Sequence, residues 1–174
     1  MKKQEVVNLL KDCEAVQYGR FVLTSGAVSD YYVDLKKACT SPKVLKILAE
    51  EMTAYINDYE IIAGMELGAV PLAVALSLES GLPYVIIRKG QREHGTGKQI
   101  EGPDVNGKRV LIVEDVTTSG GSVAQTINIL RRNNALVDHV LCIVDRDSGA
   151  KEKIEQLDVR FTPLLTIDDI RPKK

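Results

Sequence analysis

The sequence has no tryptophan, two histidines and three cysteines among its 174 residues. Cys13, Cys39 and Cys142 are far apart, and no C-x-x-C pair occurs. With so few thiol and imidazole groups, a structural zinc site is not expected, and we expect the thiols to be reduced. The sequence therefore indicates neither a zinc-stabilised fold nor a disulfide-linked one.

Long apolar runs and an excess of charge are also missing. No stretch reaches the roughly 18 apolar residues that a membrane span requires, and the N-terminal MKKQEVVNLL lacks the apolar core of a signal peptide. We therefore expect a cytoplasmic protein without a membrane partner. The formal net charge of −1 gives no general attraction to nucleic acid.

The apolar residues that are present, 44% of the chain, suffice to bury one core, and the length suits a single domain. Segments with helical spacing alternate with short apolar runs at 61–65, 84–87, 110–113 and 140–144. Continuous runs of this kind are typical of parallel strands that are covered by helices on both faces. We predict an α/β fold with a doubly wound parallel sheet.

A pair of short strands before this alternation predicts a small N-terminal hairpin subdomain, within residues 21–34. Pro163 interrupts the last strand, at about 159–167, which makes it either an edge strand or a return to the hairpin. We expect a single domain over residues 1–174, with a hood formed by about 1–40 and 159–170 and a core over about 41–158.

Residues 109–122, RVLIVEDVTTSGGS, join a buried strand to a helix through a short polar segment. Glu114 and Asp115 follow the apolar run of the strand. The start of a helix presents free backbone N–H groups and the positive end of its dipole to an anion. Val116 leads into a segment whose hydroxyl groups and glycines favour such a site, namely Thr117, Thr118, Ser119, Gly120, Gly121 and Ser122.

The two carboxylates before this segment suit a phosphorylated sugar. Glu114 and Asp115 can accept hydrogen bonds from vicinal hydroxyl groups while the segment that follows binds the phosphate. Gly120 and Gly121 allow the backbone to approach the ligand, and we expect Gly121 to take a positive φ. An ordinary strand-to-helix turn with an acidic N-cap region would account for the same residues without a ligand.

The segment VLIVEDVTTSGGS resembles the phosphoribosyl pyrophosphate (PRPP) motif of the type I phosphoribosyltransferases. The chain has neither a Walker A loop nor a G-x-G-x-x-G fingerprint after a strand. The resemblance implies that Glu114 and Asp115 hold the ribose hydroxyls, with Asp115 as a catalytic residue, and that residues 117–122 hold the 5′-phosphate. It also implies Mg²⁺ as a cofactor, bound mainly through substrate oxygens, so no protein ligand is assigned to it.

Residues 88–102 form a basic, glycine-rich segment without a helical or strand period. Such a segment can close over an anion as a lid, although a solvated loop with incidental charge would have the same composition. Its R-K-G-Q-R-E-H-G resembles the R-K-x-x-K-x-H-G loop of orotate phosphoribosyltransferases, with Arg92 in place of a lysine. The resemblance implies a homodimer that shares this loop between subunits, and PRPP binding by Arg88, Lys89, Arg92 and His94, the last two being catalytic.

The hairpin resembles the same family, because residues 21–34 fit the pattern F-x-L-x-S-G-x-x-S-x-Y-Y-x-D. Many members have a lysine before the Ser-Gly pair, and this lysine reaches PRPP. Thr24 stands there in this chain, and we leave it out of the site. The resemblance makes Tyr32 a candidate for contact with orotate, whereas strand propensity and packing would explain the tyrosines without one.

Arg146 follows the strand at 140–144, where an arginine points into the crevice in which parallel sheets bind ligands. A guanidinium can bind a carboxylate in bidentate fashion, whereas pairing with Asp145 or Asp147 would give Arg146 a structural role. The resemblance assigns Arg146 and Thr118 to orotate. The connection at 66–70 also follows a strand, and without a lysine it can offer pyrophosphate only backbone atoms.

These segments all follow strands, so the topology of a parallel sheet brings them to one edge and predicts an enzyme. The resemblance implies an orotate phosphoribosyltransferase of pyrimidine biosynthesis, with PRPP and orotate as its small-molecule partners. Its products would be orotidine 5′-phosphate and pyrophosphate. A purine phosphoribosyltransferase is one alternative. A PRPP-sensing regulator that binds nucleic acid is another, and the near-neutral charge argues against it.

Overall fold

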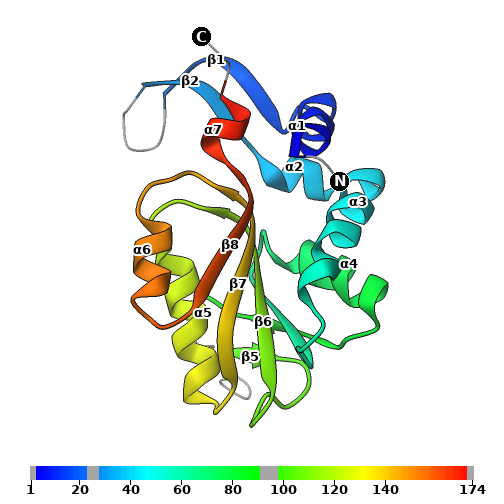
Figure 1. Cartoon of the computed structure of the whole chain (residues 1–174), viewed down its shortest axis with the longest axis vertical. Coiled ribbons are helices and arrows are strands. Elements are labelled where there is room, and N and C mark those ends of the chain that lie inside the picture. The colour runs from blue at the N-terminus through cyan, green and yellow to red at the C-terminus, as the bar shows by residue number, and fades with distance from the viewer. Residues whose placement is uncertain (1–2, 23–27, 91–97, 172–174) are drawn as a thin grey trace.

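The computed structural model describes residues 3–22, 28–90 and 98–171. Its core is a six-stranded sheet in the order β5-β4-β3-β6-β7-β8, and a separate hairpin, β1-β2, lies at one end of the molecule (Figure 1). Neighbours from β4 to β8 run parallel, whereas β5 pairs antiparallel with β4. The predicted parallel sheet is confirmed, with a short antiparallel strand at its edge that the sequence did not indicate.

The strands of the large sheet are β3 (Ile61–Met65), β4 (Tyr84–Ile87), β5 (Ile100–Glu101), β6 (Arg109–Thr117), β7 (Leu136–Asp145) and β8 (Arg160–Thr166). The hairpin consists of β1 (Val16–Val22) and β2 (Val28–Val33). The helices are α1 (Lys3–Asp12), α2 (Leu35–Cys39), α3 (Pro42–Met52), α4 (Val70–Ser80), α5 (Gly121–Arg132), α6 (Ala150–Glu155) and α7 (Ile167–Ile170), and a 3₁₀ turn, η1 (Thr53–Tyr55), follows α3. Within the described ranges, every helix is too short or too polar to span a bilayer.

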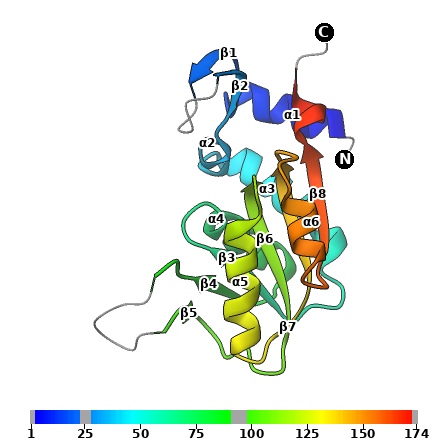
Figure 2. The same ribbon diagram turned by 90° about the vertical axis from the view of Figure 1, so that its left-hand side faces the viewer.

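Helices cover both faces of the large sheet, and Figure 2 shows α5 and α6 in front of it. On one face, Leu48 of α3 and Leu72 of α4 share a buried cluster with Leu111 of β6. On the other face, Ile127 of α5 lies in a cluster with Ile112 of β6. Leu111 and Ile112 are adjacent, so alternate residues of β6 serve opposite faces. The doubly wound arrangement expected from the continuous apolar strands is therefore confirmed.

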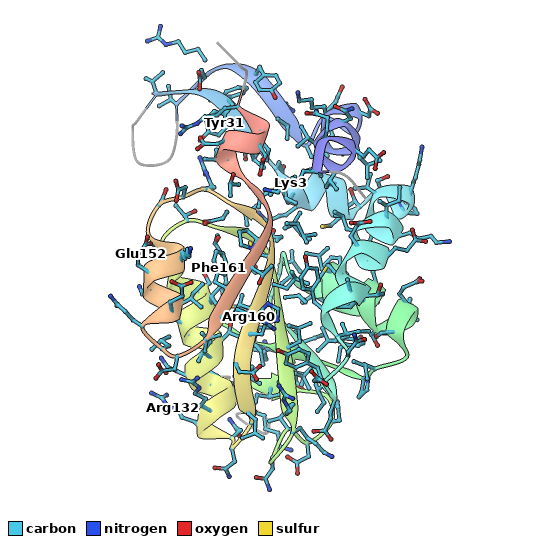
Figure 3. The ribbon with its side chains drawn as sticks, viewed as in Figure 1. Lys3, Tyr31, Arg132, Glu152, Arg160 and Phe161 are labelled. Atoms are coloured by element: carbon cyan, nitrogen blue, oxygen red, sulfur yellow. The ribbon has the colours of Figure 1, made fainter. Side chains whose placement is uncertain are left out.

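The hairpin lies beyond one end of the large sheet, with α1 and α7 near it (Figures 1 and 2). Lys3 of α1, labelled in Figure 3, forms an ion pair with Asp169 of α7, with Nζ and Oδ2 2.9 Å apart. The last strand is an edge strand, because β8 stands last in the strand order. It pairs with β7 from Arg160 to Thr166. Of the stretch 159–170 expected in the hood, only α7 lies with the hairpin. The division into hood and core stays a prediction.

Ser41 and Pro42 in the sequence predict a helix that starts at this point, and α3 starts at Pro42 as expected, whereas the short helix before it was not foreseen. The helix α2 was not predicted, because so short a helix has too few residues to show a period. Asp34 caps it by accepting a hydrogen bond from the N–H of Lys36 at 3.1 Å. Ser41 occupies the N-cap position of α3, but its side chain makes no capping hydrogen bond. Pro42, in the first turn, is therefore the main local signal for the start of α3.

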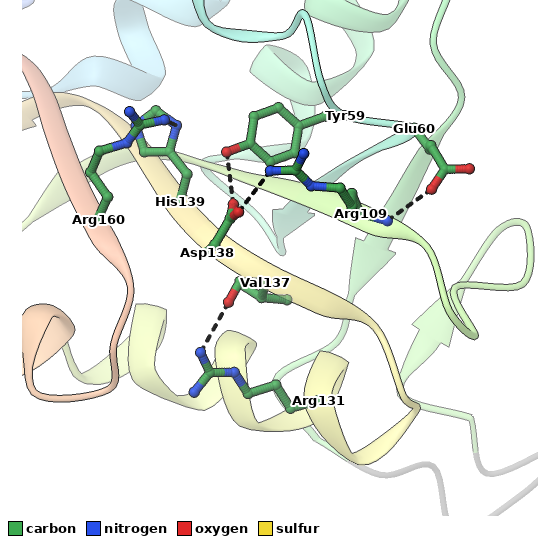
Figure 4. A network of polar contacts seen from close by, with 8 residues as sticks. All are labelled: Tyr59, Glu60, Arg109, Arg131, Val137, Asp138, His139 and Arg160. Carbon is green, nitrogen blue, oxygen red and sulfur yellow. Dashed lines mark hydrogen bonds and ion pairs between the residues drawn. The ribbon is translucent and has the colours of Figure 1, made fainter.

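A polar network lies at the amino ends of β6, β7 and β8 (Figure 4). Asp138 accepts hydrogen bonds from Tyr59 Oη and Arg109 Nη2, both at 2.8 Å. Arg160 donates to Nδ1 of the buried His139 at 3.0 Å. Burial, followed by the charge of Arg160, lowers the pKa of His139 to about 4, so the ring is neutral at pH 7. The polar groups of this edge therefore bind one another.

Candidate active site

A pocket of about 200 Å³ lies where β6 passes into α5. The predicted anion-binding segment forms most of its wall, which consists of Glu114, Val116, Thr117, Thr118, Ser119, Gly120, Gly121, Ser122 and Val123. We call residues 117–122 the cradle. Thr118, Ser119, Gly121 and Ser122 of the cradle are exposed and accessible to a ligand. The segment therefore encloses a hollow in addition to connecting a strand to a helix.

Gly120, and not Gly121, is the glycine that the turn requires. Gly120 has a φ of 72° at the N-cap of α5, and a Cβ added to it would lie 3.1 Å from Cα of Ala150. The expectation that Gly121 takes a positive φ is wrong. β6 also extends to Thr117, so the two acids lie in the strand. The alternative of an acidic N-cap region is therefore wrong as well.

Glu114 and Asp115 each bind the backbone of the next residue. Glu114 Oε1 accepts a hydrogen bond from the N–H of Asp115 at 3.1 Å, and Asp115 Oδ1 accepts one from the N–H of Val116 at 2.9 Å. Glu114 is only 7% exposed. Burial is the main cause that raises the pKa of Glu114 to about 8, and Asp115 adds to it. Burial therefore favours the protonated form of Glu114, which can donate a hydrogen bond as well as accept one.

The connection between β3 and α4 meets this acid pair at Gly68. A Cβ added to Gly68 would lie 2.6 Å from Cγ of Asp115, closer than real Cβ contacts. With the Asp115 carboxyl group where it lies, a residue without a side chain is the one that fits at this position. The sequence analysis did not single out Gly68, because one glycine in Glu-Leu-Gly-Ala-Val has no distinctive pattern. The structure places the 66–70 backbone beside Asp115.

Arg88 lies just past the carboxyl end of β4. Its Nε is buried and has no hydrogen-bond acceptor in the described part of the chain, while its Nη1 lies 3.6 Å from Oε1 of Glu101. A buried donor without an acceptor is costly unless water or a ligand supplies one. The arginine predicted to bind an anion therefore has an unused hydrogen-bond donor.

Lys89 follows Arg88, and its positive charge favours the ionised form of Glu114. Its backbone N–H donates a hydrogen bond to Oε1 of Glu66 at 2.8 Å. The other two basic residues of the predicted lid, Arg92 and His94, lie outside the described residues. Of the predicted lid cations, the structure therefore describes Arg88 and Lys89.

Arg146 is tied to the cradle through the backbone. Its N–H donates a hydrogen bond to the carbonyl of Thr117 at 3.0 Å. Asp145 accepts hydrogen bonds from Thr117 Oγ1 at 2.9 Å and from the N–H of Asp147 at 3.2 Å. Within residues 3–22, 28–90 and 98–171, Arg146 forms no ion pair, so the alternative of a structural pair with Asp145 or Asp147 is not supported.

Comparisons with known proteins agree with this geometry. Residues 40–169 match the phosphoribosyl transferase domain. The orotate phosphoribosyltransferase of Methanosarcina acetivorans is 47% identical over 171 residues, which are 97% of this chain and 91% of that protein. The chain belongs to the orotate phosphoribosyltransferase family. It is therefore a phosphoribosyltransferase.

Solved structures of the family extend the likeness to the fold. The crystal structure of Mycobacterium tuberculosis H37Rv orotate phosphoribosyltransferase in complex with Fe(III) dicitrate has a TM-score of 0.85 and 34% identity, covering 98% of this chain and 99% of that chain. A crystal structure of the same enzyme in complex with PRPP has a TM-score of 0.80 and 32% identity, covering 97% and 98%. The fold is therefore that of the family over nearly the whole chain.

The tyrosines that match the family pattern lie on opposite faces of the hairpin, as adjacent strand residues do. Tyr31 is buried, whereas Tyr32 is 41% exposed and its ring centroid lies 5.6 Å from that of Phe21. Tyr32 does not line the pocket at the cradle, so contact with orotate stays a prediction. Thr24 lies outside the described residues.

A phosphoribosyltransferase that uses Mg²⁺ needs hard oxygen ligands near the substrate. In the described ranges, no group of three or more His, Cys, Asp and Glu side chains could hold a metal ion by itself. Glu114 and Asp115 supply carboxyl oxygens near the pocket, and a backbone N–H engages one oxygen of each. Glu114 can give an oxygen to a cation only without its proton, so a cation here would take most of its ligands from the substrate.

The raised pKa of Glu114 predicts a pH-dependent stability. Burial raises the pKa of Glu114 from the usual 4.5 to about 8 in the folded chain. The stability that its proton confers is therefore complete below about pH 4.5 and lost as the pH rises to about 8. We expect Glu114→Gln to lack this loss, so its melting temperature should rise relative to that of the parent between about pH 5 and pH 8. Parallel pH profiles of the two melting temperatures would contradict the shift.

Proposed function

We propose that the edge of the sheet formed by the carboxyl ends of β3, β4, β6 and β7 binds PRPP and orotate together. The chain, as an orotate phosphoribosyltransferase, transfers the 5-phosphoribosyl group of PRPP to orotate in pyrimidine biosynthesis, giving orotidine 5′-phosphate and pyrophosphate. The observation that best supports this assignment is the pocket at the cradle, which the segment resembling the PRPP motif lines.

The cradle is assigned to the 5′-phosphate of PRPP. Thr118, Ser119 and Ser122 offer hydroxyl donors, and the first turn of α5 offers backbone N–H groups and the positive end of its dipole. The ribose hydroxyls are assigned to Glu114 and Asp115. A protonated Glu114 suits this role, since a hydroxyl group can both donate to it and accept from it.

Pyrophosphate is the leaving group, and negative charge grows on it as the bond to ribose breaks. Arg88 and Lys89, with Arg92 and His94, are assigned to this charge. Arg88 Nε supports the assignment, because this buried donor has no acceptor among the residues that the structure describes. Mg²⁺, bound mainly through substrate oxygens, would neutralise part of the charge of the pyrophosphate group. No side chain needs to act as a covalent nucleophile.

Orotate is assigned to Thr118 and Arg146, with Tyr32 as a further candidate. Arg146→Ala should raise the KM for orotate about 10- to 100-fold and leave the KM for PRPP much less affected, because only orotate has a carboxylate for this guanidinium. Steady-state kinetics with each substrate varied in turn measures both constants. Equal rises in the two KM values would contradict the assignment.

A substrate screen tests the proposed function. The purified chain, with PRPP and Mg²⁺, is offered orotate, hypoxanthine, adenine and uracil, and release of pyrophosphate is measured. We expect release with orotate alone. Turnover of hypoxanthine or adenine would instead indicate a purine enzyme. Binding of nucleic acid without turnover of orotate would indicate a regulator.

A homodimer that shares the 88–102 segment between subunits is part of the proposal. The likeness of this segment to the family's loop motif supports it. The cytoplasmic location also stays a prediction.

A further inference from the structure

The peptide groups at Lys89 are bound by side chains from two other elements. Oε1 of Glu66, in the connection between β3 and α4, accepts a hydrogen bond from the N–H of Lys89 at 2.8 Å. Nε2 of Gln125, in α5, donates a hydrogen bond to the carbonyl of Lys89 at 3.1 Å. The donor and the acceptor of one residue are therefore both satisfied by side chains.

The preceding residue is held in another way. The N–H of Arg88 donates to the carbonyl of Gln99 at 2.9 Å, which continues the pairing of β4 and β5. Regular backbone pairing thus ends at Arg88. At Lys89, Glu66 and Gln125 take over the role that a neighbouring strand would have.

The side chain of Lys89 gives this arrangement a functional meaning. Its positive charge is among the causes that favour the ionised form of Glu114, so the ammonium group lies within electrostatic reach of the acid pair. Glu66 belongs to the connection that meets Asp115 at Gly68, and Gln125 lies one turn beyond Ser122 of the cradle. Both side chains link Lys89 to elements that already form the site.

We propose that Glu66 and Gln125 are positioning residues that hold the backbone of Lys89 so that its ammonium group meets PRPP. The inference rests on the proposed role of Lys89 in binding PRPP. A fixed backbone lowers the entropy that the lysine loses when the ligand binds. The Lys89 N–H donates to a carboxyl oxygen of Glu66, and hydrogen bonds to a carboxylate are about twice as strong as neutral ones.

Substitutions that remove either hydrogen bond should weaken PRPP binding. We expect Glu66→Ala and Gln125→Ala each to raise the KM for PRPP about tenfold, with a smaller effect on the KM for orotate and on kcat. Glu66→Gln keeps an acceptor and should restore most of the affinity. Gln125→Glu replaces the donor by an acceptor that repels the Lys89 carbonyl, so it should exceed Gln125→Ala in effect.

Gln125 is exposed on α5, so we expect the chain to fold normally when this residue is substituted. Asn128 is exposed on the same helix and serves as a matched control, so Asn128→Ala should leave both KM values unchanged. Hydrogen exchange of the Lys89 amide gives a second readout without turnover. Its protection should fall in Glu66→Ala and persist in Asn128→Ala.

The outcomes separate the inference from the function on which it rests. If Lys89→Ala leaves the KM for PRPP unchanged, the proposed role of Lys89 fails and the positioning role fails with it. If Lys89→Ala raises that KM while Glu66→Ala and Gln125→Ala do not, only the positioning role is overturned. A higher Mg²⁺ requirement in Glu66→Ala, with an unchanged KM for PRPP, would assign Glu66 to the metal and also overturn it.

Discussion

Replacing Gly68 with alanine is expected to lower kcat/KM for PRPP about 100-fold. The added methyl group would have to occupy the space of the Asp115 carboxyl group, because a Cβ at this position would lie 2.6 Å from its Cγ. Either the carboxyl group or the 66–70 backbone must move. A displacement of about 1 Å at a reacting centre is enough to cost about 10²-fold in rate. Steady-state kinetics with PRPP as the varied substrate measures the loss.

A double variant shows whether the loss comes from this one collision. In an Asp115→Ala background the space opposite Gly68 is free, so Gly68→Ala should have little further effect. The two substitutions should therefore be strongly non-additive, as expected for residues in direct contact. Melting curves first show that each variant is folded. If the two losses in kcat/KM then multiplied fully in the double variant, Gly68 and Asp115 would act separately.

Arg92→Ala and His94→Ala are each expected to lower kcat about 10²- to 10³-fold, the usual cost of removing one charge-stabilising group. Both residues are assigned to the charge that grows on pyrophosphate. Steady-state turnover with saturating PRPP and orotate measures kcat. Arg132→Ala is the matched control, because Arg132 is exposed at the far end of α5 from the cradle (Figure 3).

The same pair of variants decides between the two interpretations of the segment at 88–102. A solvated loop with incidental charge predicts that Arg92→Ala and His94→Ala behave like Arg132→Ala. A lid predicts that they lose turnover while the control keeps it. Normal turnover in either variant would make the lid assignment of that residue wrong.

The sequence predicted the large sheet well because its strands are continuous apolar runs. Tyr84–Ile87 is strand β4 as expected, and the apolar run at 110–113 lies within β6. The end of β6 was harder to predict. Glu114 and Asp115 are polar, yet parallel pairing with β7 keeps them in the strand as far as Thr117. Tertiary pairing here overrides the local preference of the side chains.

The sequence indicated the residues that line the pocket where one continuous motif supplies them, and it did not indicate the contacts made by separate elements. The cradle appears in the sequence as a single run of small and hydroxyl residues. Gly68, Glu66 and Gln125 contact residues that are distant in sequence, so no local pattern indicates them. The choice between Gly120 and Gly121 could not be made either, because contact with Ala150 of α6 decides it.

The central claim is that the cradle binds the 5′-phosphate of PRPP while Glu114 and Asp115 bind its ribose. A crystal structure of this chain with PRPP and Mg²⁺ tests it most directly. We expect the 5′-phosphate within hydrogen-bond distance of the Thr118–Ser122 backbone and the ribose hydroxyls within hydrogen-bond distance of both carboxyl groups. A PRPP molecule bound elsewhere, with the pocket at residues 114–123 left unused, would contradict the claim.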